Sequence, residues 1–199
     1  MAFEDKYIGF PPEIRLTHLI HLVAFFGLAL SGFFIHNPLG LGALAAVKWV
    51  RFTHTVSAIF FYATFVFRLY YAFGTGDYVN FKLLPEDLPQ AKEWLKYYFF
   101  LRPEKPVQRK YNPLQKFTYY TLITLLLLQA ATGLGLYFKH DFPWVLAIMA
   151  GLQSVRTLHF FVAVILTAIV GLHFYLTLTA ADQRLRKSMF ALGRIRSRD

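Results

Sequence analysis

One uncharged stretch constrains this chain more than any other feature. The 31 residues from Thr17 to Val47 contain no Asp, Glu, Lys or Arg, and three further long apolar stretches follow. A helix of about 20 apolar residues crosses a hydrocarbon core roughly 30 Å thick. We therefore predict an all-α membrane protein, a bundle of four transmembrane helices in a single domain (1–199). The helices are expected at residues 16–36, 50–73, 115–138 and 155–179.

The composition excludes an ordinary soluble protein. Apolar residues make up 56% of the chain and charged residues 16%, against about 45–50% and about 25% in globular proteins. The basic residues gather between and after the apolar stretches, so the net charge of +10 indicates a lipid bilayer rather than nucleic acid. The absence of cysteine excludes disulfides, thiolate-held iron–sulfur clusters and covalently attached c-type haem.

The distribution of basic residues predicts the orientation. Seventeen of the 21 Lys and Arg residues fall on the side of the termini and of the loop between the second and third spans. The positive-inside rule places both termini and this loop in the cytoplasm. The acidic start of the chain has no export pattern, so we expect the first helix to be retained.

Two cytoplasmic segments are expected to lie against the membrane. In the loop, Asp87-Leu88-Pro89 followed by Gln90 to Phe100 predicts a capped amphipathic helix on the membrane surface. The basic tail from Arg184 to Arg198 is interpreted as an anchor to anionic lipids.

Histidines recur at the starts of the predicted helices. The pattern Arg-x-x-His occurs three times, as Arg15/His18, Arg51/His54 and Arg156/His159. His173 follows His159 by fourteen residues, which is roughly 21 Å along a helix and within about 40° of the same face. One helix thus offers two imidazoles at two membrane depths.

The predicted topology pairs these four histidines by depth. The second and fourth helices start outside, which brings His54 and His159 to one level, whereas His18 shares the inner level with His173. Two axial histidines are what a b-type haem requires. We therefore expect two b-type haems, an outer one on His54/His159 and an inner one on His18/His173. The guanidinium groups expected to bind the haem propionates belong to Arg15, Arg51, Arg68 and Arg156.

Several alternatives stay open. His21 lies in the same first turn as His18 and is its main rival, although only His18 belongs to an Arg-x-x-His repeat. His36 and His140 are interpreted as interfacial residues. A single-haem protein and a haem-free transporter or scaffold are also compatible with four spans. A proton relay usually includes intramembrane carboxylates, which the predicted spans do not contain.

The two halves of the chain look like a diverged duplication. Fourteen residues after His54 comes Arg68, and the same distance after His159 comes His173. Likewise Ser31-Gly32 in the first helix corresponds to Thr132-Gly133 in the third, and Tyr119 takes the place of His18. The third helix is therefore not expected to supply a ligand.

These motifs resemble the membrane cytochrome b subunits of quinone-linked hydrogenases and formate dehydrogenases, in the bacterial b561-like group. The likeness covers nearly the whole chain and rests on the motifs Arg15-x-x-His18, Arg51-x-x-His54, Arg68-Leu-Tyr-Tyr-Ala-Phe, Tyr111-Asn112-Pro113-Leu114-Gln115-Lys116, Thr132-Gly133, Arg156-x-x-His159 and His173. The resemblance implies two haems, with an iron–sulfur subunit near the outer one and a quinone near the inner one. Asn112 and His173 correspond to residues beside that quinone, and Gln115 lies in the same stretch. The formate dehydrogenase type usually has Gly where this chain has Leu114.

The resemblance therefore predicts an electron-transfer subunit in a bacterial inner membrane. It is expected to connect the iron–sulfur and catalytic subunits of a periplasmic hydrogenase or formate dehydrogenase with the quinone pool, and to carry no primary catalysis itself. Quinone reduction takes up protons, which Asn112, Gln115 or Lys116 are placed to supply. The main alternative is a free-standing b561-like haem oxidoreductase.

Overall fold

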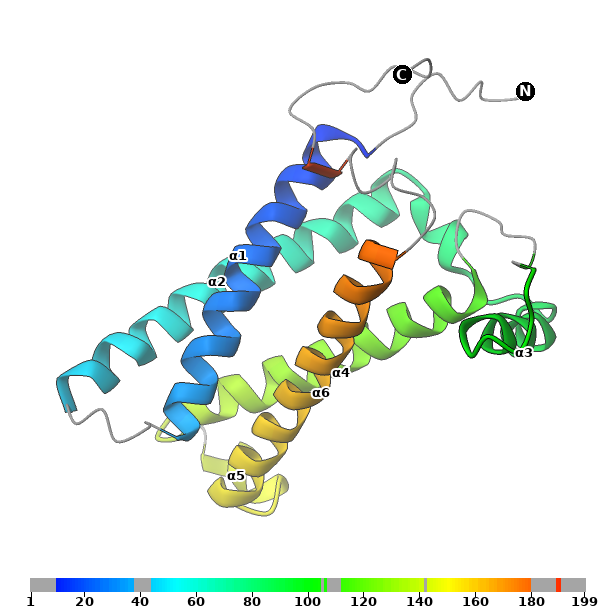
Figure 1. Cartoon of the computed structure of the whole chain (residues 1–199). Helices are drawn as coiled ribbons and strands as arrows, with labels where there is room; N and C mark the ends of the chain where they lie inside the picture. The colour runs from blue at the N-terminus through cyan, green and yellow to red at the C-terminus, as the bar shows by residue number, and fades with distance from the viewer. Residues whose placement is uncertain are drawn as a thin grey trace. The chain divides into compact units, whose positions relative to one another are not determined.

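A computed structural model describes residues 10–37, 44–104, 106, 112–141, 143–179 and 189–190. The described chain is helical and contains no strand, so the all-α prediction is confirmed. In chain order the elements are α1 (Pro12–His36), α2 (Leu44–Gly74), a short 3-10 helix η1 (Asp77–Phe81), α3 (Asp87–Tyr98), α4 (Pro113–Tyr137), α5 (Pro143–Ile148) and α6 (Leu152–Thr179) (Figure 1).

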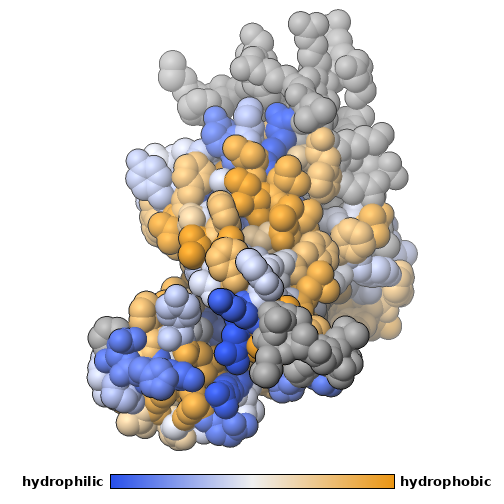
Figure 2. All heavy atoms as spheres, turned by 90° about the vertical axis from the view of Figure 1, so that its left-hand side faces the viewer, coloured by the Kyte–Doolittle hydropathy of each residue, from blue (hydrophilic) through white to orange (hydrophobic). Residues whose placement is uncertain are grey.

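Four of these helices are long and apolar enough to cross a membrane. They are Pro12–His36, Val47–Gly74, Pro113–Tyr137 and Leu152–Leu178, so the four predicted spans are confirmed. Large apolar side chains stand on their outer faces, among them Leu30, Val23 and Val66, which are 61–71% exposed. Figure 2 shows hydrophobic side chains over much of the face it presents. Such a surface is stable only against lipid.

Proline and asparagine determine where two spans begin. Pro12 lies at the first helical position of α1, where the missing N–H costs nothing. Asn112 caps α4 through a complete capping box with Gln115, and Pro113 follows it. Both helices therefore start earlier than predicted, because the boundaries were drawn from the apolar run alone.

The described residues form two compact units. One comprises Met1–Leu69 and Thr167–Asp199, which includes α1, most of α2 and the second half of α6. The other comprises Tyr70–Leu166, which includes η1, α3, α4, α5 and the first half of α6. His18, His21, His54 and His173 belong to the first unit, and His159 belongs to the second.

The second unit contains two short helices that the sequence analysis did not predict, η1 and α5. The chain passes from α5 into α6 through Ala150 and Gly151, whose φ angles are 60° and 93°. These left-handed conformations let the Gly151 N–H donate to the Leu146 carbonyl at 2.7 Å and end α5. Glycine suits the second position because an L side chain rarely adopts that φ.

The predicted loop helix is present as α3, with a different start. It begins at Asp87 rather than Gln90 and ends at Tyr98. Trp94 on α3 is 1% exposed and anchors the helix within the second unit. Tyr111 of the sequence motif and, apart from residues 189–190, the expected basic anchor at 184–198 lie outside the described residues.

Candidate functional site

His18 and His173 lie near each other in the first unit. They are close enough to interact electrostatically. The Nδ1 atom of His18 is buried and has no hydrogen-bond partner among the described residues. A buried polar atom in this condition is costly unless a ligand binds it. Phe190 packs edge-on to the His18 ring at 6.4 Å between centroids.

His21 has a different environment one turn along α1. Its Nδ1 lies 2.7 Å from the Thr64 hydroxyl on α2, and its ring stacks on Phe61 with 3.8 Å between centroids. His21 thus contributes to α1–α2 packing, whereas Nδ1 of His18 has no hydrogen-bond partner among the described residues. This difference favours His18 as the inner ligand, and the assignment stays a prediction.

His54 on α2 is held by α1. Its Nδ1 lies 2.9 Å from the Ser31 hydroxyl, and that hydroxyl itself donates to the Gly27 carbonyl one turn earlier. A Cβ atom added to the neighbouring Gly32 would lie 3.3 Å from Cε1 of the His54 ring. The serine fixes the ring, and the glycine leaves room for its edge.

His159 on α6 has the same surroundings, supplied by α4. Its Nδ1 lies 2.9 Å from the Thr132 hydroxyl, which donates to the Leu128 carbonyl at 2.8 Å. A Cβ atom on Gly133 would lie 3.2 Å from Cε1 of this ring. In addition, the side-chain nitrogen of Gln129 lies 3.1 Å from Nε2. Thr132 is fully buried.

These residues fit an axially ligated haem better than a directly bound metal ion. Among the residues that the structure describes, no three His, Asp or Glu side chains gather into a metal-ion site. A haem needs only two axial imidazoles, each with a free ring nitrogen. In His54 and His159 Nδ1 lies within hydrogen-bond distance of a hydroxyl, so Nε2 is the ring nitrogen that would bind iron. In His159, iron binding requires the flexible Gln129 amide to move aside.

The four predicted propionate partners differ in exposure. Arg51 and Arg156 are exposed, and Arg15 and Arg68 are half-buried. Arg15 donates from Nε to the Phe10 carbonyl at 2.9 Å, and Arg68 interacts with other groups of the chain. The guanidinium groups of Arg51 and Arg156 are therefore the more accessible of the four. A propionate role for each of the four stays a prediction.

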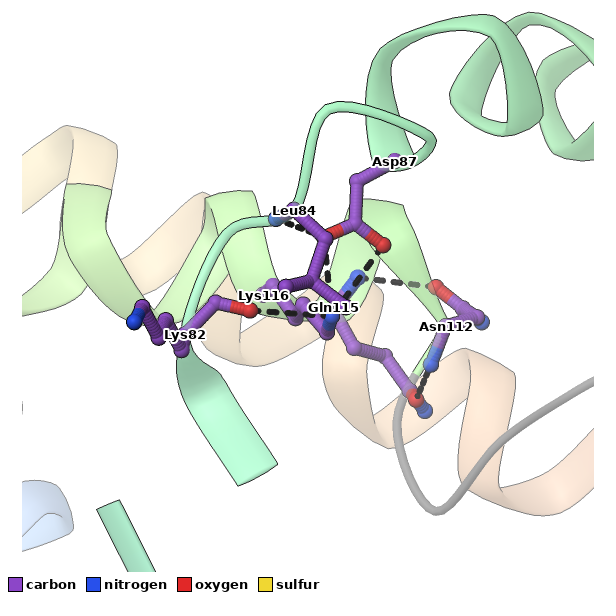
Figure 3. Close-up of polar contacts among 6 residues, drawn as sticks. All are labelled: Lys82, Leu84, Asp87, Asn112, Gln115 and Lys116. Atoms are coloured by element: carbon purple, nitrogen blue, oxygen red, sulfur yellow. Dashed lines mark hydrogen bonds and ion pairs between the residues drawn. The ribbon is translucent and has the colours of Figure 1, made fainter. Parts of the chain in front are cut away.

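The predicted quinone residues lie at the start of α4 (Figure 3). Asn112 is 2% exposed; its Oδ1 accepts from the Gln115 N–H at 2.8 Å, and its Nδ2 donates to the Tyr98 hydroxyl at 3.3 Å. Gln115 is exposed, and its Oε1 accepts from the Asn112 N–H at 2.9 Å. The side-chain nitrogen of Gln115 has no hydrogen-bond partner in the described part of the chain. Both residues thus form the helix cap, and Gln115 retains a donor for a ligand.

Lys116, the next residue, is buried in an ion pair. Its ammonium group lies 2.8 Å from Oδ2 of Asp87 and 3.1 Å from the Lys82 carbonyl, as Figure 3 shows. The Asp87 carboxylate also accepts from the Leu84 N–H at 2.6 Å. Lys116 therefore joins α4 to the start of α3, and its proton is not exposed to solvent.

Comparison with known proteins assigns the family. The sequence matches the family described as prokaryotic cytochrome b561 over residues 9–191. The chain belongs to this family. It is similar to probable Ni/Fe-hydrogenase B-type cytochrome subunits of Rhizobium leguminosarum bv. viciae (30% identity, 81% of this chain and 76% of the relative) and of Rhodobacter capsulatus (26% identity, 73% and 64%). It is also similar to a putative protein-methionine-sulfoxide reductase subunit of Azospira oryzae (26% identity, 85% and 90%).

Membership in the b561 family confirms the general prediction. The chain is a multi-pass membrane cytochrome b with a role in electron transport, and the family implies b-type haem. The predicted resemblance to hydrogenase cytochrome subunits is likewise confirmed.

The sequence analysis missed the groups that hold the histidines. Ser31 and Thr132 were noted as equivalent positions of a duplication, and their hydrogen bonds to His54 and His159 were not foreseen. The available signal was that each hydroxyl precedes a glycine at the same offset in both halves. Gln129 gave no such signal, because its counterpart in the first half is Leu28.

Proposed function

We propose that the chain is the di-haem b-type cytochrome subunit of an inner-membrane oxidoreductase complex, with both termini in the cytoplasm. It carries electrons between an iron–sulfur subunit of a hydrogenase-like complex and a quinone. The observation that carries the proposal is that His18 and His173, which the sequence pairs at one membrane depth, belong to the same unit and lie close enough for their charges to interact. The hydrogenase partner is supported by the similarity to Ni/Fe-hydrogenase cytochrome subunits.

The four histidines would act as two ligand pairs. His18 and His173 would bind the inner haem, and His54 and His159, which the sequence analysis assigns to a common level, would bind the outer one. Bound haem supplies one-electron redox chemistry, because its iron alternates between the ferric and ferrous states. The protein contributes orientation of the imidazoles, exclusion of water by the apolar spans, and positive charge for the propionates from Arg51 and Arg156.

The quinone site is placed at the cytoplasmic start of α4. Gln115 is exposed there and has an uncommitted amide donor suited to a quinone carbonyl. Asn112 positions Gln115 through the capping box. Lys116 is held by Asp87, which favours water hydrogen-bonded to Gln115, rather than the lysine, as the source of protons.

A haem count tests the proposal. The purified chain should give two b-type haems in a pyridine haemochrome assay, and His54→Ala and His173→Ala should each lower this number to one. His140→Ala is the matched control, because His140 is exposed beyond the end of α4. A wild-type chain without haem would overturn the proposal. A count of one that only one of the two substitutions abolishes would reduce it to a single-haem cytochrome.

A second candidate function follows from the relative in Azospira oryzae, of which this chain covers 90%. In that case the electrons leave the quinone pool and reach a methionine-sulfoxide reductase partner. Membranes containing the complex separate the two functions. Haem reduction on adding hydrogen supports the hydrogenase role, and oxidation of reduced haem on adding a methionine-sulfoxide peptide supports the reductase role.

A further inference from the structure

The same hydrogen-bond arrangement occurs twice in this chain, on different helices. In the first unit α1 presents a hydroxyl followed by glycine, Ser31-Gly32, to His54 on α2. In the second unit α4 presents Thr132-Gly133 to His159 on α6. Both hydroxyl–Nδ1 distances are 2.9 Å. The equivalent positions differ in identity, serine in one half and threonine in the other, yet both keep a hydroxyl against the histidine ring.

Iron ligation through Nε2 would fix the direction of these bonds. Each hydroxyl oxygen lies within hydrogen-bond distance of the ring Nδ1 and of two backbone carbonyls of its own helix, those of Gly27 and Leu28 for Ser31 and those of Leu128 and Gln129 for Thr132. A hydroxyl has one hydrogen to donate. When Nε2 gives its lone pair to iron, Nδ1 carries the ring proton, so the hydroxyl accepts from Nδ1 and donates its own hydrogen to a carbonyl.

From this we propose that Ser31 and Thr132 are positioning residues that lock His54 and His159 as Nδ1–H tautomers, with Nε2 presented to haem iron. The inference rests on the proposed haem function and deepens it. The adjacent glycines complete the arrangement, because a Cβ atom would lie 3.2–3.3 Å from Cε1 of each ring. Each imidazole is thus held by its Nδ1 atom and by the close fit of its edge.

A hydrogen-bond acceptor beside Nδ1, the ring nitrogen that does not bind iron, affects the basicity of the imidazole as well as its orientation. It increases the basicity of the imidazole, and groups in this position typically alter metal affinity by about 10–100-fold. A more basic ligand favours ferric over ferrous iron. Removing the hydroxyl should therefore raise the midpoint potential of the haem at that site and weaken its retention.

The test uses the purified full-length chain with matched substitutions. Thr132→Val removes the hydroxyl at nearly constant shape, and Thr132→Ser keeps it. Thr124→Val is the control on the same helix, because the exposed Thr124 hydroxyl donates only to the Tyr120 carbonyl in the described structure. Ser31→Ala, with Ser31→Thr as its conservative partner, repeats the experiment at the other histidine. The readouts are the midpoint potential of each haem, the low-spin ferric EPR signal and the rate of haem transfer to apomyoglobin.

We expect Thr132→Val and Ser31→Ala each to shift one haem to a more positive potential, to change its EPR g values and to speed its loss by about 10–100-fold. The serine and threonine variants and the Thr124 control should behave as wild type. Unchanged potentials and EPR signals in both hydroxyl-free variants, with two haems still bound, would overturn the positioning role alone. A wild-type chain without haem would instead refute the proposed function on which it rests.

Discussion

The buried ion pair between Lys116 and Asp87 offers a quantitative test of how the loop between α2 and α4 is held. The side chains of the pair are 4% and 6% exposed, and the ammonium group has three oxygen neighbours at 2.8–3.1 Å. Lys116→Met leaves the Asp87 carboxylate buried without its cationic partner, although the Leu84 N–H still donates to it. Breaking a buried pair from one side costs about 3–5 kcal/mol. This corresponds to a rise of roughly two to four orders of magnitude in the opening equilibrium of the α3 region.

Amide hydrogen exchange of residues 84–98, followed by mass spectrometry on the chain in nanodiscs, measures this opening. The double variant Asp87→Asn/Lys116→Met removes both charges and keeps an acceptor for Leu84, so it should be less open than Lys116→Met. Lys96→Met removes the exposed bridge to Glu93 and should change the exchange less than about fivefold. An exchange rate for Lys116→Met that matches the Lys96 control would refute the argument that the buried pair holds α3.

Three further predictions concern packing, pH and capping. Gly27→Ala places a Cβ atom against the Ser57 side chain and should lower the melting temperature of the apoprotein. Gly171→Ala is the control, because a Cβ atom added there has no neighbour within 4 Å among the described residues, and it should leave the melting temperature unchanged. Equal melting temperatures for the two variants would contradict this reasoning. Burial raises the pKa of the Tyr98 phenol, and the hydrogen bond from Asn112 opposes this shift. The neutral phenol therefore stabilises the folded state fully below about pH 10, and this stabilisation is lost as the pH rises through the pKa of the folded state. Protease resistance of the α3 region should fall in that range in wild type and change less steeply in Tyr98→Phe; parallel profiles would argue against a role for the phenol. Asn112→Ala should destabilise the start of α4 by about 1 kcal/mol, whereas Asn112→Ser keeps a capping oxygen and should not. Hydrogen exchange of the first-turn amides of α4 measures this difference. An effect of the same size in both variants would show that capping is not the cause.

The sequence predicted the four spans because each apolar run exceeds the thickness of a bilayer. Lateral packing was not needed for that prediction, since every backbone group of a helix is satisfied within the helix itself. The boundaries were less accurate, because Pro12 and Asn112 extend two helices into polar sequence. The short α5 was missed because six residues carry too little periodicity to separate a helix from a loop.

The site was partly predictable for a similar reason. The number of residues between His159 and His173 gives their separation along the helix, and His18 lies close enough to His173 for their charges to interact. The Ser31 and Thr132 hydrogen bonds depend on the rotation of α1 and α4 about their axes, which one sequence does not reveal. The Lys116–Asp87 pair joins residues 29 positions apart, so it depends on the path of the loop between them.

The helix α6 acts as a molecular ruler. It is continuous from Leu152 to Thr179 and carries His159 and His173, so the distance between these imidazoles is set by the number of intervening residues. Deleting one of them would shorten the interval by about 1.5 Å and turn His173 by about 100°, whereas exchanging a lipid-facing leucine for another apolar residue would do neither. A change in the length of this interval therefore alters the position of the proposed ligand His173, whereas a change in the identity of its apolar residues leaves that position in place.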